Sequence, residues 1–299
     1  MATRAPLLVV GSVNMDLLFT GLAALPRPGE TVSAAHFRIA PGGKGANQAA
    51  AAGRLGGAVH LVAAIGDDDL GDQAHTALAA DGVGLDHVRR VAAPTGVAAV
   101  VVDATGENSI IVTPGANAML RGEDAAAVAA HYADTAAVVL ACLEVPLDTV
   151  TAWARLARAN GWTLVLNPAP APSAPLPAEL LALVDVLTPN ETELASLGTV
   201  EALLEAGVGA VIVTRGGEGA DLHERDGDTV HQPAFPAEPV DTTGAGDAFN
   251  GALATALAEG ADLVEALAFG AAAGALSTRG FGARDGLPTR DEVAALRAS

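Results

Sequence analysis

The sequence has few basic side chains. Among its 299 residues, 16 are Lys or Arg and 35 are Asp or Glu, which gives a formal net charge of −19 and a pI near 4.5. A chain so poor in positive charge lacks the broad basic surface that neutralises nucleic-acid or membrane phosphates. We therefore expect neither a nucleic acid nor an anionic membrane as a partner, and any bound phosphate must be met by a local site.

Cysteine and long apolar runs are also scarce. The lone Cys142 lies in the apolar segment AAVVLACLEV and has no partner for an internal disulfide, which indicates a buried thiol in a reducing compartment. The apolar run LLVVG at 7–11 is followed at once by polar residues, so it fits neither a secretory leader nor a membrane span. We expect a cytoplasmic protein.

Lysine is the scarcest charged residue, because fifteen of the sixteen basic side chains are Arg and only Lys44 is Lys. A single Lys in an Arg-using chain indicates a place that needs a compact ammonium, and a residual surface charge is the alternative. Two nucleotide-binding motifs are missing as well. The sequence has no GxxxxGK[ST] loop and no GxGxxG after a strand, which removes the main support for a nicotinamide dehydrogenase.

What the chain does have is a βαβ rhythm. Short β-branched runs such as LLVVG, VHLVAAIG and TLVLNP alternate with longer Ala- and Leu-rich segments, and 51% of the residues are hydrophobic. This alternation predicts an α/β fold with a mostly parallel sheet covered by helices on both faces. In such sheets, ligands bind at the carboxyl ends of the strands.

Two stretches, 14–40 and 95–112, interrupt the rhythm with strand-like pieces and no intervening helix. They predict a small antiparallel sheet inserted in a single domain that spans 1–299. This sheet suits a lid over a ligand, an oligomer interface or a simple extension of the main sheet.

The segment DTTGAGDAFNG at 241–251 passes from a strand end through small residues into a helix. Glycines at a helix start expose N–H groups at the positive end of the helix dipole and make a pocket for phosphate. Asp247 in this turn has two interpretations. It is either an ordinary helix cap or a base that takes a proton from an alcohol during phosphoryl transfer.

Three further segments carry polar groups in patterns that suit a ligand. In APGGKGANQAAAAGRLG at 40–56, Lys44 and Asn47 share a helix face. In GSVNMDL at 11–17, Asn14 and Asp16 point the same way if the segment is extended, although Asx turns also explain them. In TPNETE at 188–193, Asn190 and Glu193 suit either the binding of hydrated Mg²⁺ and nucleotide phosphates or a capping box.

Together these segments resemble the ribokinase branch of the carbohydrate and nucleoside kinase superfamily from about residue 7 to about 290. The resemblance rests on an ordered series of motifs: GSVNMD, PRPGETV, GGKGANQAAAAGRLG, TGVA, GENSIIVTPGAN, LE at 143–144, NPAPA, TPNETE, TRGGEG and DTTGAGDAFNGAL. It implies a ribokinase-like three-layer α/β/α domain with a β lid that often carries a dimer contact. It also implies transfer of phosphate from ATP, as Mg²⁺–ATP, to O5 of D-ribose.

The resemblance assigns roles to individual positions. The base would be Asp247, and the backbone amides of Gly244, Ala245, Gly246 and Asp247 would hold the transferring phosphate. The sugar would be bound by Asn14, Asp16, Gly42, Gly43, Lys44, Asn47, Glu144 and Asp247. The ATP side would be lined by Asn190, Glu193, Thr214, Gly216, Gly219 and Gly246.

The resemblance also implies an activating K⁺ ion held by Asp241 and by backbone carbonyls near Thr243, Ser277 and Gly282. The segment STRGFGARDG at 277–286 departs from the usual family spacing, and its last residue is Gly where a serine is often found. Other substrates remain open, namely 2-deoxyribose, fructose or adenosine. A sugar-binding regulator without catalysis is a further alternative.

Overall fold

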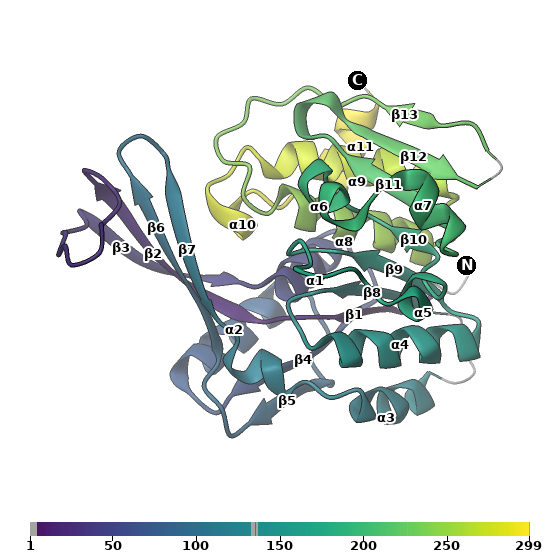
Figure 1. The fold of residues 1–299 in the computed structure, drawn as a ribbon, viewed down its shortest axis with the longest axis horizontal. Coiled ribbons are helices and arrows are strands. Elements are labelled where there is room, and N and C mark those ends of the chain that lie inside the picture. The colour runs from purple at the N-terminus through teal and green to yellow at the C-terminus, as the bar shows by residue number, and fades with distance from the viewer. Residues whose placement is uncertain (1–4, 133–134, 136, 226, 299) are drawn as a thin grey trace.

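The structure is a computed structural model that describes residues 5–132, 135, 137–225 and 227–298. It contains a nine-stranded sheet between two layers of helices, and a four-stranded sheet that projects from this body (Figure 1). The predicted α/β class, with a mostly parallel sheet covered by helices and a second small sheet, is therefore confirmed. Within the described part of the chain, no helix combines the length and apolar character needed to cross a bilayer.

The large sheet has the strand order β13-β12-β11-β10-β9-β8-β1-β4-β5. Every neighbouring pair from β5 to β11 is parallel, and the last two pairs, with β12 and β13, are antiparallel. The strands are β1 (Leu7–Val10), β4 (Val59–Gly66), β5 (Val88–Val91), β8 (Val138–Cys142), β9 (Thr163–Asn167), β10 (Val186–Leu187), β11 (Ala210–Thr214), β12 (Ala220–Glu224) and β13 (Val230–Gln232).

Helices cover both faces of this sheet because successive strand residues point to opposite sides. In β1, Leu7 and Val9 join one buried core and Leu8 and Val10 join the other. The first core packs against α1 (Lys44–Arg54), α2 (Asp69–Ala80), α8 (Ala245–Ala258), α9 (Leu263–Ser277) and α11 (Arg290–Arg297). The second packs against η1 (Gly115–Met119), α3 (Glu123–His131), α4 (Leu147–Asn160), α5 (Ala178–Leu181), α6 (Glu191–Leu197) and α7 (Val200–Glu205).

Cys142 ends β8 in the middle of this body. Its side chain is fully buried, and burial raises the pKa of its thiol to about 11. The thiol is therefore protonated at neutral pH, in agreement with the prediction of a buried structural cysteine.

The small sheet is built from β3 (His36–Gly42), β2 (Asn14–Leu22), β6 (Gly96–Asp103) and β7 (Asn108–Thr113), in that order. The outer pairs, β2 with β3 and β6 with β7, are antiparallel hairpins. The central pair, β2 with β6, is parallel, so the sheet as a whole is mixed. All six residues of β7 are exposed, which contrasts with the buried strands of the body.

Candidate active site

Helix α1 begins in direct backbone contact with the end of β1. A Cβ at Gly45 would lie 2.5 Å from the carbonyl carbon of Gly11. At Gly43, where φ is +86°, a Cβ would lie 2.6 Å from the amide nitrogen of Asn14. Only glycine permits these approaches. The GGKG run therefore sets the first turn of α1 against the start of β2, and Lys44 is its first helical residue.

The start of β2 supplies the two polar residues predicted to point together. Asn14 is buried, and its Oδ1 accepts a hydrogen bond of 2.7 Å from Asn117. The Asp16 carboxylate lies against Gly42, where a Cβ would be 2.3 Å from Oδ1. Burial raises the pKa of Asp16 to about 6, and the nearby carboxylate of Glu144 adds to this effect.

Glu144 follows β8 and closes the other side of the α1 start. Its Oε2 accepts hydrogen bonds from the Ser12 hydroxyl at 2.5 Å and from the backbone N–H of Lys44 at 3.0 Å. A carboxylate at a helix N-terminus is stabilised by the helix dipole. This contact holds the LE motif beside the GGKG turn.

Asp247 lies in the first turn of α8 and is buried. Its two carboxylate oxygens accept hydrogen bonds from Asn47 Nδ2 at 3.0 Å and Gln48 Nε2 at 3.1 Å, both on α1. The residue that caps α8 is Gly244, at φ +79°. The carboxylate is thus bound to another helix rather than acting as the N-cap of α8, and its role as a base stays a prediction.

The surroundings of Asp247 have opposing effects on its pKa. Burial raises the pKa of its carboxyl group, although Lys44 and the hydrogen bonds from Asn47 and Gln48 act in the other direction. Burial alone would lower the pKa of Lys44, but the carboxylates of Asp247 and Glu144 outweigh it and raise this pKa. Lys44 is therefore a charged group that lines a cavity near two carboxylates, and it is not a residual surface charge. Its function in binding stays a prediction.

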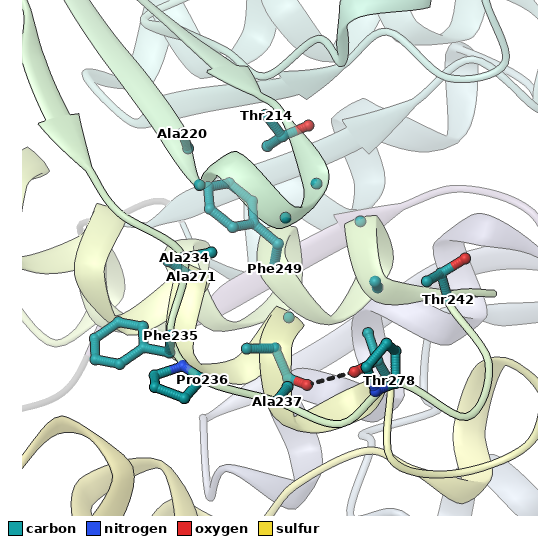
Figure 2. Close-up of a pocket in the computed structure, with 18 residues that line it drawn as sticks. Thr214, Ala220, Ala234, Phe235, Pro236, Ala237, Thr242, Phe249, Ala271 and Thr278 are labelled. Carbon is teal, nitrogen blue, oxygen red and sulfur yellow. Dashed lines mark hydrogen bonds between the residues drawn. The ribbon is translucent and has the colours of Figure 1, made fainter. Parts of the chain in front are cut away.

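A cavity of about 500 Å³ lies between α8, α9 and the loops around β11 to β13 (Figure 2). Five of the predicted ATP-side or phosphate residues line it, namely Thr214, Gly216, Gly219, Ala245 and Gly246. The remaining lining residues are Gly217, Ala220, Ala234, Phe235, Pro236, Ala237, Pro239, Thr242, Phe249, Ala271, Gly274, Ala275 and Thr278.

A second cavity of about 160 Å³ adjoins the first, and Thr214 and Gly246 line both. The residues that line only the second are Lys44, Asn167, Ala169, Thr188, Asn190, Glu193, Gly244, Asp247 and Asn250. The backbone at Gly246 is open, because a Cβ there would meet no atom within 4 Å. The two cavities are therefore neighbours, and Asp247 is among the residues that line the smaller one.

Asn190 and Glu193 form the capping box that their spacing predicts. Asn190 Oδ1 accepts from the Glu193 N–H at 2.8 Å, and Glu193 Oε2 accepts from the Asn190 N–H at 2.9 Å. Burial raises the pKa of Glu193. Because both residues also line the small cavity, capping and a role beside the phosphates are compatible.

The predicted cation ligands converge only in part. Asp241 accepts from the N–H groups of Thr243 at 2.9 Å and Gly282 at 2.8 Å. Although its burial acts to raise its pKa, these hydrogen bonds hold the pKa below the ordinary value, so the carboxylate is charged at neutral pH. Thr278, rather than Ser277, accepts the backbone N–H of Asp241 through its carbonyl oxygen, at 3.1 Å.

The unusual Gly286 has a structural reason. A Cβ at this position would lie 2.0 Å from the carbonyl oxygen of Ser277, so this backbone path excludes the serine that the resemblance leads one to expect. The backbone conformation of the 277–286 segment therefore requires glycine at position 286.

Two functional candidates were missed by the sequence-based prediction. Gln48 has no exposed surface and its Nε2 bridges Asp247 and Asn167. Arg284, in α10 (Gly282–Asp285), is 5% exposed, and its Nε donates to Asn47 Oδ1 at 2.9 Å. The signal for Gln48 was a polar residue among alanines directly after Asn47. For Arg284, the sequence around it gives no comparable signal.

Known proteins match this chain over nearly its full length. The model of the pfkB family carbohydrate kinases matches residues 4–290. A ribokinase from Bacillus subtilis is 41% identical over 96% of this chain and 98% of its own. A deoxyribokinase from Salmonella typhi is 35% identical over 95% of this chain and 96% of its own.

Solved structures agree with these sequence relatives. The structure of Arabidopsis thaliana ribokinase complexed with ribose and ATP superposes with a TM-score of 0.88 at 36% identity, covering 98% of this chain and 99% of that one. The family match, the sequence identity and the fold thus agree with the carbohydrate kinase family that the sequence motifs resemble. The chain belongs to the pfkB family of carbohydrate kinases.

Proposed function

We propose that the protein transfers phosphate from ATP to O5 of D-ribose and forms ribose 5-phosphate and ADP. The observation that carries this proposal is the buried Asp247 carboxylate, which lies where the cavity beside α8 meets the polar residues of α1. The Arabidopsis thaliana relative, whose structure holds ribose and ATP, supports the choice of both substrates.

In the proposed reaction, Asp247 takes the proton of the sugar's primary hydroxyl group, and the oxygen of that hydroxyl group attacks the γ-phosphorus of ATP. The bond from that phosphorus to the bridging oxygen breaks, and ADP leaves. The amides from Gly244 to Asp247, at the start of α8, stabilise the negative charge of the phosphoryl group. Lys44 supplies the nearby positive charge that the acidic surface of the protein does not provide.

The sugar is held by hydroxyl-binding groups around the start of α1. Carboxylates and amides accept or donate the hydrogen bonds that a polyol requires, and buried ones do so selectively. These groups come from Asn14, Asp16, Lys44, Asn47 and Glu144, with Gly42 and Gly43 permitting close backbone approach.

Mg²⁺ suits the ATP side of this site. Hydrated Mg²⁺ binds through few carboxylates and through substrate phosphates. Glu193 lines the small cavity, and one of its oxygens is engaged in the capping box, which leaves the other for metal-bound water. Bound Mg²⁺ would neutralise the ATP phosphates, and Asn190 and Glu193 would orient its water shell.

K⁺ fits the turn around Asp241. This carboxylate stays charged at neutral pH, and the carbonyls of Thr243, Ser277 and Gly282 are the proposed partners. Replacing K⁺ by Na⁺ in the assay is expected to lower the rate, and Asp241→Asn should remove the difference between the two cations. Equal rates in the two buffers would contradict K⁺ activation.

The substrate proposal is tested by ADP release with ribose, 2-deoxyribose, fructose and adenosine at saturating Mg²⁺–ATP. Ribose should give the highest kcat/KM. A preference for 2-deoxyribose would favour the second candidate, which the 35% identity to a deoxyribokinase supports. Tight sugar binding without ADP release would instead favour a regulator without catalysis.

We also infer a cytoplasmic homodimer that forms through the small sheet. Its support is the group of exposed apolar side chains on that sheet, Phe37, Ile39, Ile110, Ile111 and Val112, of which Ile111 is 67% exposed. Ile111→Asp should shift sedimentation from dimer to monomer, with Asp103→Asn as a control on the same sheet. Cell fractionation tests the location.

A further inference from the structure

Arg284 is not among the residues that the family motifs assign to the site, yet its guanidinium contacts two residues of the GGKGANQAAAAGRLG motif, Asn47 and Gly42. We propose that Arg284 is a positioning residue for phosphoryl transfer, which orients the Asn47 amide toward Asp247 and balances the charge of Asp16. This inference rests on the proposed sugar kinase activity, because it concerns the same base and the same sugar site.

The burial of this arginine is the first observation. Its side chain is 5% exposed, whereas each of the other arginines that form ion pairs in the described part of the chain has at least 32% of its side chain exposed. A buried cation is costly unless nearby groups compensate its charge. The local structure must therefore provide that compensation.

The contacts of its guanidinium are directed at the sugar site. Nε donates to Asn47 Oδ1 at 2.9 Å, and Nη2 lies 3.4 Å from the carbonyl oxygen of Gly42. Nη1 has no hydrogen-bond partner in the part of the chain that the structure describes, and lies 3.8 Å from the Asp81 carboxylate. The shortest of these contacts is thus to a side-chain amide of α1.

That contact fixes the direction of the Asn47 side chain. A guanidinium can only donate and an ionised carboxylate can only accept, so an amide between them has one favourable orientation. Its oxygen faces Arg284 and its Nδ2 donates to Asp247 at 3.0 Å. A reversed amide would place two donors together at one end and two acceptors together at the other.

The charge of Arg284 acts on Asp16 as well. Burial, Glu144 and Asp247 all raise the pKa of Asp16, and Arg284 is the group that lowers it. Among the charged groups around these carboxylates, Lys44 acts on Asp247, while Asp81 and Arg54 act on Arg284. Removing Arg284 therefore leaves Asp16 with acidic neighbours alone.

The test is the pH profile of kcat/KM for ribose with four proteins: wild type, Arg284→Met, Arg284→Lys and the control Arg155→Met. Arg155 is an exposed partner of Glu179 on the opposite face of the sheet, so its loss reports only the effect of removing an arginine. Arg284→Met should move the acidic limb to higher pH by about one unit, because loss of a nearby positive charge raises the pKa of the Asp16 carboxyl group by roughly that amount. Its kcat should fall about ten-fold, since the base loses its oriented donor.

Arg284→Lys keeps the charge but lacks the planar fork and the Nε donor. We expect its acidic limb to stay near that of the wild type while its kcat falls. A folded Arg284→Met with the wild-type limb and kcat overturns the proposal. If circular dichroism shows that Arg284→Met does not fold, Arg284→Lys decides the test. Wild-type kcat in Arg284→Lys overturns the orienting role. A reduced kcat in Arg284→Lys, with the acidic limb unmoved, supports it.

Wild-type ADP release on ribose separates this inference from the function beneath it. No ribose-dependent release by the wild type would defeat the proposed function, and the inference with it. Normal wild-type release together with superimposable profiles for Arg284→Met would defeat the inference alone.

Discussion

The proposed sugar side and the proposed nucleotide side of the site differ in the residues that form them. Around the start of α1, charged and amide side chains are buried and hydrogen-bonded to one another, as in the contacts of Asp247 and Glu144. None of the eighteen described residues that line the large cavity carries a charge, and many are Gly, Ala or Pro. Side-chain chemistry therefore defines the first side, and backbone shape defines the second.

This difference predicts that substitutions on the sugar side change chemistry, whereas those on the nucleotide side change shape. Asp247→Asn is the sharpest test. It keeps the volume but removes the base, so kcat should fall about 1,000-fold, within the usual range for a general base. Sugar binding measured by calorimetry should remain, and near-normal turnover would contradict the assignment of Asp247.

Lys44→Met should have the next largest effect. The variant removes the cation that opposes the raised pKa of Asp247, so kcat/KM should fall about 100-fold, as for loss of one transition-state donor. The acidic limb of the pH profile should also move to higher pH, because Asp247 must be ionised to act. Lys44→Arg should be impaired too, and full activity in it would show that a compact ammonium is not required.

Asp16→Asn should act in opposite directions on activity and stability. Its pKa of about 6 in the folded protein lies above the ordinary value of 3.8, so folding favours the protonated form and stability falls as pH rises from about 4 to 6. The neutral variant should gain about 1–3 kcal/mol in free energy of unfolding at pH 7. Its KM for ribose should rise about ten-fold.

Chemical unfolding at pH 4 and pH 7 provides the check for Asp16. The gain should largely disappear at pH 4, where wild-type Asp16 is already protonated. A variant less stable than the wild type at pH 7 would show that the charge of Asp16 is fully compensated.

Gly219→Ala tests the nucleotide side and should have the smallest effect on chemistry. At φ +101° its Cβ would lie 2.0 Å from the carbonyl oxygen of Gln232, so we expect about 1–3 kcal/mol of destabilisation and a few-fold higher KM for ATP. The matched control is Gly217→Ala, where a Cβ meets nothing within 4 Å. Thermal melts should separate the two, and equal melting temperatures would refute a shape-based requirement.

The same comparison explains what the sequence could reveal. The alternation of strands and helices, and the capping box of Asn190 and Glu193, follow from local spacing and were predicted. The two interpretations of Asp247 could not be separated locally, because the donors that bind it lie 199 and 200 residues away. Family resemblance supplied the role, and the structure supplied the partners.

Other features depended on contacts that no local pattern encodes. The parallel pairing of β2 with β6 brings together segments that are separated in the chain by three strands and two helices. Arg284 looks like an ordinary surface arginine in the sequence, and it is buried because α10 packs against α1, α9 and β3. Tertiary packing determines such strand pairings and buried side chains, and local sequence patterns do not predict them.

The distance in sequence between Asn47 and Asp247 also bears on how the enzyme matures. During synthesis α1 emerges early, and its buried amides have no carboxylate to bind until α8 follows 200 residues later. Contacts of such long range form late, because closing the chain between them costs entropy. Recovery of kinase activity after dilution from denaturant should therefore be among the last signals to appear, later than the return of helical circular dichroism.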